Sequence, residues 1–365
     1  MRFHASLINQ YYKKWQSQSP IVLSQSNPQP LTLEELESII GSTENLFDQK
    51  EALDYSTVQG DETLRSVIAE LYDQNNAENI ATFAGAQEAI FCATHSLVEP
   101  GDKVVAITPI FEPLIKTAQD IGCEIELISL QTHDQWELDL NQLEDAINDD
   151  CKLLILNFPH NPTGAMISEE QLLQIINICE RNNCWILSDE VFRGLEHMPE
   201  DRLPAVSDLY EKSISIGVLS KAFALPALRI GWISCQNKKV LDQTLQVKDY
   251  LSICNSFLDE KLATRVIPHH DQIWERNRKL ITNNLDQLNK HFEHYQNKFK
   301  LSQPQAGCTG FPIIKDDQTA TEFSEQLIRS KKLMVLPDEL FLTELNGFRL
   351  GFGHDHHAEN YRFLL

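Results

Sequence analysis

Residues 152–189 read KLLILNFPHNPTGAMISEEQLLQIINICERNNCWILSD, and this stretch decides the fold. Its two ends, 152–157 and 184–188, are short apolar runs of the kind found in strands buried on both faces of a parallel sheet. The residues between them, 168–182, carry apolar side chains at helical spacing. A strand, a helix and a second strand in this order predict an α/β domain with helices on both faces of a mainly parallel sheet.

The same alternation extends in both directions along the chain. Further strands are predicted at 103–107, 124–130, 213–218 and 230–235, and further helices at 86–98 and after Asp61. After about Lys239, long helical stretches lead to a Gly/Pro segment and short strands. We therefore expect a large α/β domain over 45–240, and a smaller α+β domain formed by 1–44 and 241–365 that packs on it.

The composition is that of an ordinary folded protein with an acidic excess. Of 365 residues, 42% are apolar, and 31 basic against 53 acidic residues give a formal net charge of −22. This charge repels phosphate backbones and anionic lipids, so we expect neither nucleic-acid nor membrane partners. No two of the eight cysteines are separated by only two residues, and no apolar run suits a signal peptide or a membrane span. We expect a reduced, cytoplasmic protein without a metal site.

Polar residues follow three of the predicted strands, where ligands bind in open α/β sheets. Asn161 follows 152–157 in a Pro/Gly turn, Asp189 ends the strand at 184–188, and Lys221 follows 213–218. Each residue has an alternative interpretation. Asn161 would suit a plain loop, Asp189 would suit a helix cap, and a lone lysine would suit the solvated surface. Burial would lower the pKa of Lys221 and make its amine a nucleophile toward carbonyls, and Arg229 would suit a phosphate. A lysine nucleophile, a phosphate-binding arginine and a carboxylate for a ring nitrogen are what pyridoxal phosphate needs.

Four segments together resemble the signature of the class I/II aminotransferases. They are Asn161-Pro-Thr-Gly, Asp189-Glu, Ser220-Lys221 with Arg229-Ile-Gly, and Phe348-Arg349-Leu. The resemblance runs over roughly 53–352 and implies fold type I, with a seven-stranded sheet in the large domain. It also implies pyridoxal 5′-phosphate as the cofactor, and an L-amino acid and a 2-oxo acid as substrates.

The resemblance assigns a role to each matched position around the reacting centre. Lys221 would carry the cofactor covalently and move a proton, and Asp189 would keep the ring nitrogen protonated. Asn161 would bind the phenolic oxygen of the cofactor and face the substrate, whose carboxylate Arg349 would clamp in a bidentate pair. Phe111 stands where the family has an aromatic side chain stacked on the ring, and a core phenylalanine is the alternative.

The phosphate of the cofactor would be held by a second group of residues. Gly85, Ala86 and Gln87 open a predicted helix, whose free backbone N–H groups and dipole favour an anion. Ser220 and Arg229 would add side-chain contacts. Tyr55 matches the tyrosine that reaches the phosphate of the neighbouring subunit in relatives, which implies a homodimer.

Two positions depart from the family pattern. Phe192 stands where the family usually has a tyrosine, whose hydroxyl also bonds the phenolic oxygen of the cofactor, and Val218 stands where a serine is frequent. The cofactor would therefore be held by fewer hydroxyl groups.

Two other functions are also considered. Residues 189–197, with 203–204 and 208–210, resemble a subgroup that includes capreomycidine synthase-like enzymes, which eliminate and cyclise arginine-derived amino acids. Glu190 and Glu196 would be compatible with a guanidinium substrate, or with a solvated surface. A non-catalytic binding protein on the same fold is the second alternative, and the complete set of Lys221, Asp189, Arg229 and Arg349 counts against it.

Overall fold

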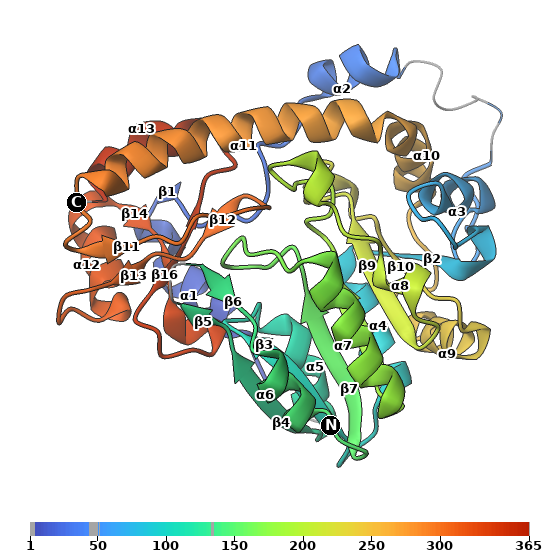
Figure 1. Cartoon of the computed structure of the whole chain (residues 1–365). Coiled ribbons are helices and arrows are strands. Elements are labelled where there is room, and N and C mark those ends of the chain that lie inside the picture. The colour runs from blue at the N-terminus through green and yellow to red at the C-terminus, as the bar shows by residue number, and fades with distance from the viewer. Residues whose placement is uncertain (1–3, 44–49, 51, 133–134, 365) are drawn as a thin grey trace.

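The computed structural model describes residues 4–43, 50, 52–132 and 135–364. Its centre is a seven-stranded sheet with the order β2-β10-β9-β8-β7-β3-β4 (Figure 1). The β10 strand is antiparallel to both of its neighbours, and the other pairs are parallel. The bounds are β2 Ile80–Phe83, β3 Lys103–Thr108, β4 Glu124–Ser129, β7 Cys151–Asn157, β8 Trp185–Asp189, β9 Ser213–Val218 and β10 Gly231–Ser234.

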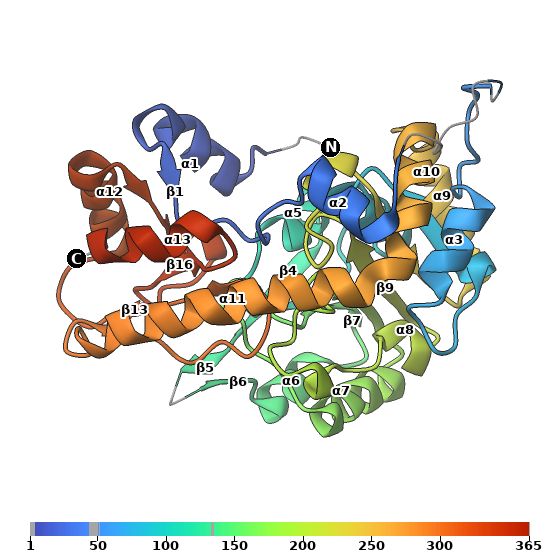
Figure 2. The ribbon, with the colours of Figure 1, turned by 90° about the horizontal axis from the view of Figure 1, so that it is seen from above.

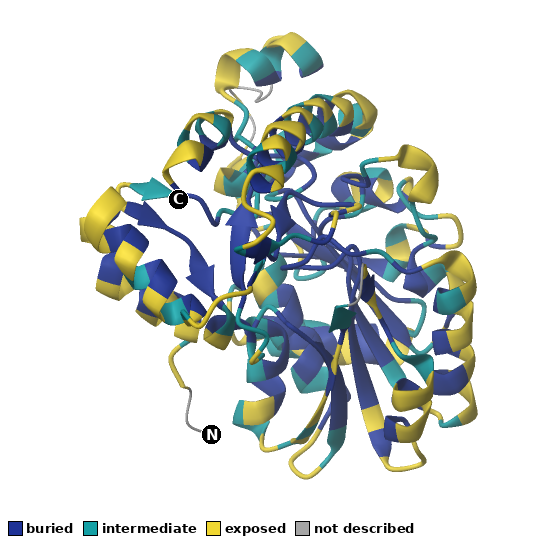
Figure 3. Ribbon diagram, turned by 60° about the vertical axis from the view of Figure 1, so that its left-hand side comes forward, coloured by how far each residue is buried: buried dark blue, intermediate teal, exposed yellow. Residues whose placement is uncertain are grey.

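Six of the seven strands are almost entirely buried, which explains their apolar character, whereas the edge strand β4 is largely exposed and carries Glu124 and Glu126. Alternate residues of a strand enter different clusters: Leu153 and Ile155 pack on one face, and Leu154 and Leu156 on the other. The first face is covered by α4 (Ala86–Leu97), α5 (Pro113–Ile121) and α9 (Lys238–Asp249), and the second by α6 (Leu140–Ala146), α7 (Glu169–Arg181) and α8 (Val206–Leu209). Figure 3 shows the buried strands inside and the exposed residues on the outer helices. The predicted α/β class and seven-stranded sheet are confirmed.

Two differences between the predicted and the observed elements have a local cause. The β2 strand was not expected, because it has only four residues and Thr82 interrupts its apolar run. The helical stretch expected after Lys239 is broken into α9 and α10 (Phe257–Val266), and Ser256 caps the second helix by accepting from the Asp259 amide. Helix α3 (Glu62–Ala69) begins after Asp61 as predicted, with the Asp61 carboxylate accepting from two backbone N–H groups.

The remaining elements form a second group beside the sheet. The long helix α11 (His270–Glu293) runs from α10 toward β13 along one side of the molecule (Figure 2). The other helices are α1 (Leu7–Trp15), α2 (Leu33–Ile40), α12 (Ala320–Lys331) and α13 (Asp355–Asn360). The short strands are β1 Ile21–Val22, β5 Gln131–Thr132, β6 Trp136–Glu137, β11 Phe299–Lys300, β12 Thr309–Gly310, β13 Ile313–Ile314, β14 Leu333–Met334, β15 Leu336–Pro337 and β16 Phe348–Gly351.

The N-terminal segment joins this second group, since β1 pairs in parallel with β14. Helix α9, which contains residue 240, packs against α4 of the sheet domain. The division of the chain at residue 240 stays a prediction, and the other predicted boundary, at 44–45, falls outside the described residues. Within the described ranges, no helix is both long and apolar enough to cross a membrane.

Candidate active site

The carboxyl ends of β7 and β8 bring Asn161 and Asp189 together through Asn157. Asn157 lies opposite Asp189 in the strand register, and its side-chain amide donates to the Asp189 carbonyl at 2.9 Å. The Asn157 Oδ1 atom accepts from the backbone N–H of Asn161 at 3.0 Å. Sequence analysis gave Asn157 no role, because it reads simply as the last residue of a strand.

Lys221 lies at the end of the neighbouring strand β9. Its Nζ atom donates to Ser26 Oγ at 2.8 Å and lies 6.0 Å from the centre of the Phe192 ring. Burial, with a smaller contribution from the neighbouring Arg349, lowers the pKa of Lys221 to about 8, against the opposing effects of Cys308 and Asp189. Lys221 is therefore no solvated surface lysine, and about a tenth of its amine is neutral at pH 7.

Asp189 is buried, with 4% of its surface exposed. Burial raises the pKa of this carboxyl to about 6, although the Val191 amide and the Lys221 ammonium both lower it. Its Oδ1 atom accepts from the Val191 amide at 3.1 Å, but a turn follows rather than a helix. The alternative of a helix cap is therefore wrong for Asp189, whose second carboxylate oxygen remains for another partner.

A cradle of backbone forms where α4 begins. Gly85 precedes the helix with a φ of 87°, and a Cβ atom built on it would lie 2.3 Å from the nearer guanidinium nitrogen of Arg229. A Cβ on Gly231 would lie 2.5 Å from the carbonyl carbon of Gly85, so this glycine permits the close approach of β10. The first N–H groups of α4, from Ala86 and Gln87, lack partners within the helix. These amides and Arg229 can hold an anion the size of a phosphate.

Arg349, in β16, faces Asn161 from the second group of elements. It is 3% exposed, and its Nη1 atom donates to Asn161 Oδ1 at 3.1 Å. Its Nε and Nη2 atoms both donate to the carbonyl of Ser24, at 3.1 and 2.8 Å. Sequence analysis missed Ser24 and Ser26, because neither belongs to a matched segment and nothing around them in the sequence indicates contact with the site.

The remaining predicted residues lie in different surroundings. Ser220 is half-buried beside Lys221, and Phe111 is half-buried after β3, in contact with both apolar clusters. Tyr55 is 82% exposed, so in a single chain its side chain faces solvent. Phe192 is fully buried, and a Cβ on Gly307 would lie 2.8 Å from its ring.

The arrangement fits pyridoxal phosphate on the chain's own geometry. A cradle that a Cβ would fill suits the phosphate, a buried carboxylate suits the ring nitrogen, and an amine with a lowered pKa suits the aldehyde. Fold and site together define a pyridoxal-phosphate-dependent enzyme of fold type I.

Comparison with known proteins gives the family. The model of aminotransferase class I and II matches residues 8–362, so the chain belongs to this family and is a pyridoxal-phosphate-dependent aminotransferase, as predicted. It is 26% identical to capreomycidine synthase from Streptomyces vinaceus over 293 residues, which cover 80% of this chain and 75% of the relative. It is 25% identical to aspartate aminotransferase from Pyrococcus horikoshii over 311 residues, with coverage of 80% and 78%. A crystal structure of an aminotransferase from Streptococcus suis 89-1591 matches with a TM-score of 0.92 and 28% identity, covering 100% of this chain and 98% of that one.

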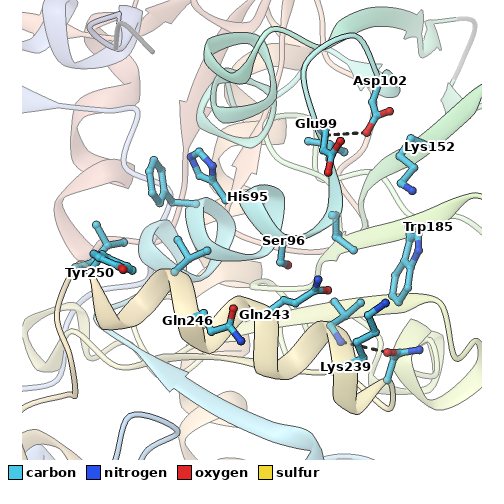
Figure 4. Close-up of a pocket in the computed structure, with 17 residues that line it drawn as sticks. His95, Ser96, Glu99, Asp102, Lys152, Trp185, Lys239, Gln243, Gln246 and Tyr250 are labelled. Carbon is cyan, nitrogen blue, oxygen red and sulfur yellow. Dashed lines mark hydrogen bonds between the residues drawn. The ribbon is translucent and has the colours of Figure 1, made fainter.

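A groove of about 900 Å³ lies away from these residues, between α4 and α9 (Figure 4). Lys152 and Trp185 line it from the start of β7 and β8, whereas Asn157 and Asp189 end the same strands. The groove therefore lies at the amino ends of these strands, and the candidate active site lies at their carboxyl ends.

The charges around Lys221 give a testable pH dependence. In the cofactor-free protein, we expect acetylation of Lys221 by acetic anhydride to accelerate with rising pH through a midpoint of about 8. Asp189→Asn should lower this midpoint, because it removes a negative charge that favours the ammonium, and Arg349→Met should raise it by removing a positive one. Mass spectrometry of the Lys221 peptide measures the rate, and midpoints that move together or not at all would contradict this electrostatic account.

Proposed function

We propose that Lys221 and Asp189 are the catalytic residues of this aminotransferase, and that Arg349 and Asn161 bind its substrates, an L-amino acid and a 2-oxo acid. The observation that carries the proposal is the meeting, at the carboxyl ends of the strands, of a half-buried lysine with a lowered pKa, a buried carboxylate and a buried arginine. Phosphate binding falls to Gly85, Ala86, Gln87, Ser220 and Arg229, and stacking on the cofactor ring to Phe111.

Pyridoxal phosphate, when bound, supplies an acceptor for the electron pair released at the substrate α-carbon. Lys221 then holds and returns the proton at its Nζ atom, which a pKa near neutrality favours. Asp189, as a carboxylate shielded from water, holds a positive charge at the ring nitrogen in place. Arg349 directs two N–H groups at the single carbonyl of Ser24, and a substrate carboxylate would offer one oxygen to each.

A homodimer is part of the proposal, with Tyr55 reaching the phosphate of the neighbouring subunit. Large apolar side chains are exposed on two neighbouring segments: Leu53 and Tyr55 are 76% and 82% exposed, and Tyr250 is 92% exposed. The segments are tied by the bond from Lys248 Nζ to the Val58 carbonyl, 2.6 Å long. An exposed apolar surface of this kind supports subunit contact. The cytoplasmic location stays a prediction from the sequence.

Elimination and cyclisation is the second candidate, favoured by the similarity to capreomycidine synthase. The two carboxylates considered for a guanidinium substrate are, however, engaged within the fold. Glu190 is buried, and its Oε1 atom accepts from Ser215 Oγ at 2.6 Å and from the Val206 amide at 3.0 Å. Glu196 accepts from the Gly194 amide and, at 3.2 Å, from Arg202 Nε. Amino transfer is therefore the better supported reaction.

The reaction type is tested by incubating the loaded enzyme with a panel of amino acids, with and without 2-oxoglutarate. We expect an oxo acid and glutamate in equal amounts, and no turnover by Lys221→Ala, which lacks the amine. Liquid chromatography with mass spectrometry identifies the products. Release of ammonia, loss of water or a cyclised amino acid would establish the second candidate instead.

Asp189→Asn should keep the cofactor but lower kcat by about 100-fold or more, the usual size of losing one electrostatic partner at a reacting group. The phosphate contacts survive, whereas the neutral amide no longer holds the ring nitrogen protonated. Steady-state kinetics and the absorbance of the bound cofactor measure the two effects separately. The exposed Asp201→Asn is the matched control, and near-normal turnover by Asp189→Asn would refute its role.

Phe192→Tyr should lower the pKa of the Lys221 nitrogen in the loaded enzyme by about one unit or less. A tyrosine hydroxyl would donate to the ionised phenolic oxygen of the cofactor and weaken its hold on the nearby proton. The shift stays small because the oxygen is ionised in both protonation states. Spectrophotometric titration of the two proteins side by side measures it, and a midpoint that rises or does not move would mean that position 192 does not face this oxygen.

A further inference from the structure

A buried lysine lies outside the candidate active site. Lys248, in α9, is fully buried, and none of the described carboxylates forms an ion pair with it. Its three N–H groups donate to the carbonyl of Val58 at 2.6 Å, the carbonyl of Thr82 at 2.7 Å and the side-chain oxygen of Asn255 at 2.9 Å. The ammonium therefore holds three oxygens around one point.

The carbonyl oxygens of Val58 and Thr82 belong to two segments with different roles in the proposed site. Thr82 is in β2, the strand that leads into Gly85 and the start of α4. Asn255 extends the hold to the next residue, because its Nδ2 atom donates to the Phe83 carbonyl at 2.8 Å. Val58 belongs to the segment that carries Tyr55. Lys248 thus fixes the approach to the phosphate cradle and the segment expected to reach the partner subunit.

A second buried charge ties the same two segments together. Glu260, in α10, is 2% exposed and accepts from Thr82 Oγ1 at 3.0 Å and from Ser56 Oγ at 2.5 Å. Lys248 and Glu260 form no ion pair with each other, and each binds a group from both segments. Burying an ammonium costs free energy that an apolar side chain of the same length would not. The hydrogen bonds of Lys248 offset this cost and hold the two segments in a fixed relative position.

We propose that Lys248 is a positioning residue that couples binding of the cofactor phosphate at the start of α4 to the segment carrying Tyr55, and through it to subunit association. The inference rests on the proposed function, namely the phosphate site around Gly85 and the homodimer. Coupling of this kind is reciprocal, so the phosphate should strengthen association by the factor by which association strengthens phosphate binding.

The test compares Lys248→Met with Lys239→Met, the same change at an exposed lysine on the groove side of α9 (Figure 4). Dissociation constants for pyridoxal phosphate and for pyridoxal, which lacks the phosphate, are measured by absorbance, and subunit association by sedimentation with each ligand. We expect Lys248→Met to weaken pyridoxal phosphate binding on the order of ten-fold, the effect of one charge-assisted hydrogen bond, and to leave pyridoxal unchanged. The strengthening of association by the phosphate should also be lost, and Lys239→Met should behave as wild type.

Equal weakening of both ligands by Lys248→Met would mean general destabilisation and would overturn the proposal, as would unchanged binding of both. Arg229→Met separates this result from the proposed site: if it keeps the full preference for pyridoxal phosphate over pyridoxal, the phosphate site itself is wrong, whatever Lys248 does. Circular dichroism checks folding. If Lys248→Met does not fold, Asn255→Ala replaces it, since this change removes only one acceptor of Lys248 and the donor to the Phe83 carbonyl. Asn255→Ala must then weaken binding of pyridoxal phosphate by a smaller factor and leave pyridoxal binding unchanged. Absence of this effect would likewise refute the coupling.

Discussion

The hydrogen-bonded register at the carboxyl ends of β7 and β8 is the constraint on which the site depends. Asn157 lies opposite Asp189 and bonds both the Asp189 carbonyl and the Asn161 amide. One side chain therefore fixes the strand that presents the carboxylate and the turn that presents Asn161. Because side chains alternate between the faces of a strand, a slip of one residue would turn Asp189 to the opposite face and separate it from Lys221.

Around this register the site gathers charges that would be costly to bury one at a time. Removing one partner of a buried charge typically costs about 3–5 kcal/mol. Arg349 is satisfied by the Ser24 carbonyl and Asn161, and the Lys221 ammonium by Ser26. Since Ser24 and Ser26 belong to one N-terminal segment, that segment completes the polar environment of two cations contributed by distant parts of the chain. This N-terminal segment therefore forms part of the site.

The parts of the fold that depend on neighbouring residues in the chain could be predicted from the sequence. The strand at 213–218 and the helix begun by Asp61 were predictable because burial of both faces and capping leave local patterns. Asp189 and Lys221 were predictable because a polar residue directly after a buried strand contrasts with its surroundings.

What could not be predicted depends on contacts far apart in sequence. Lys221 and Ser26 are separated by 195 positions, and Arg349 and Ser24 by 325, so no local pattern contains either pair. Lys248 lies in a helical stretch with polar neighbours and reads as one more solvated lysine, and only tertiary packing reveals its burial.

At position 192, the packing of the aromatic ring can be distinguished from the chemical role of a hydroxyl group. The Phe192 ring fills the space left open by the missing side chain of Gly307, and the Gly307 amide donates to the Leu195 carbonyl at 2.9 Å. Gly307 belongs to the segment leading into β12, so the ring packs the turn after β8 against the second group of elements. That packing requires an aromatic ring but no hydroxyl group. Under the proposed function, a hydroxyl at this position would bind the cofactor, and Lys221 Nζ lies over the ring, 6.0 Å from its centre. The ring is therefore held by the fold, and the hydroxyl is the part that can be lost without disturbing it.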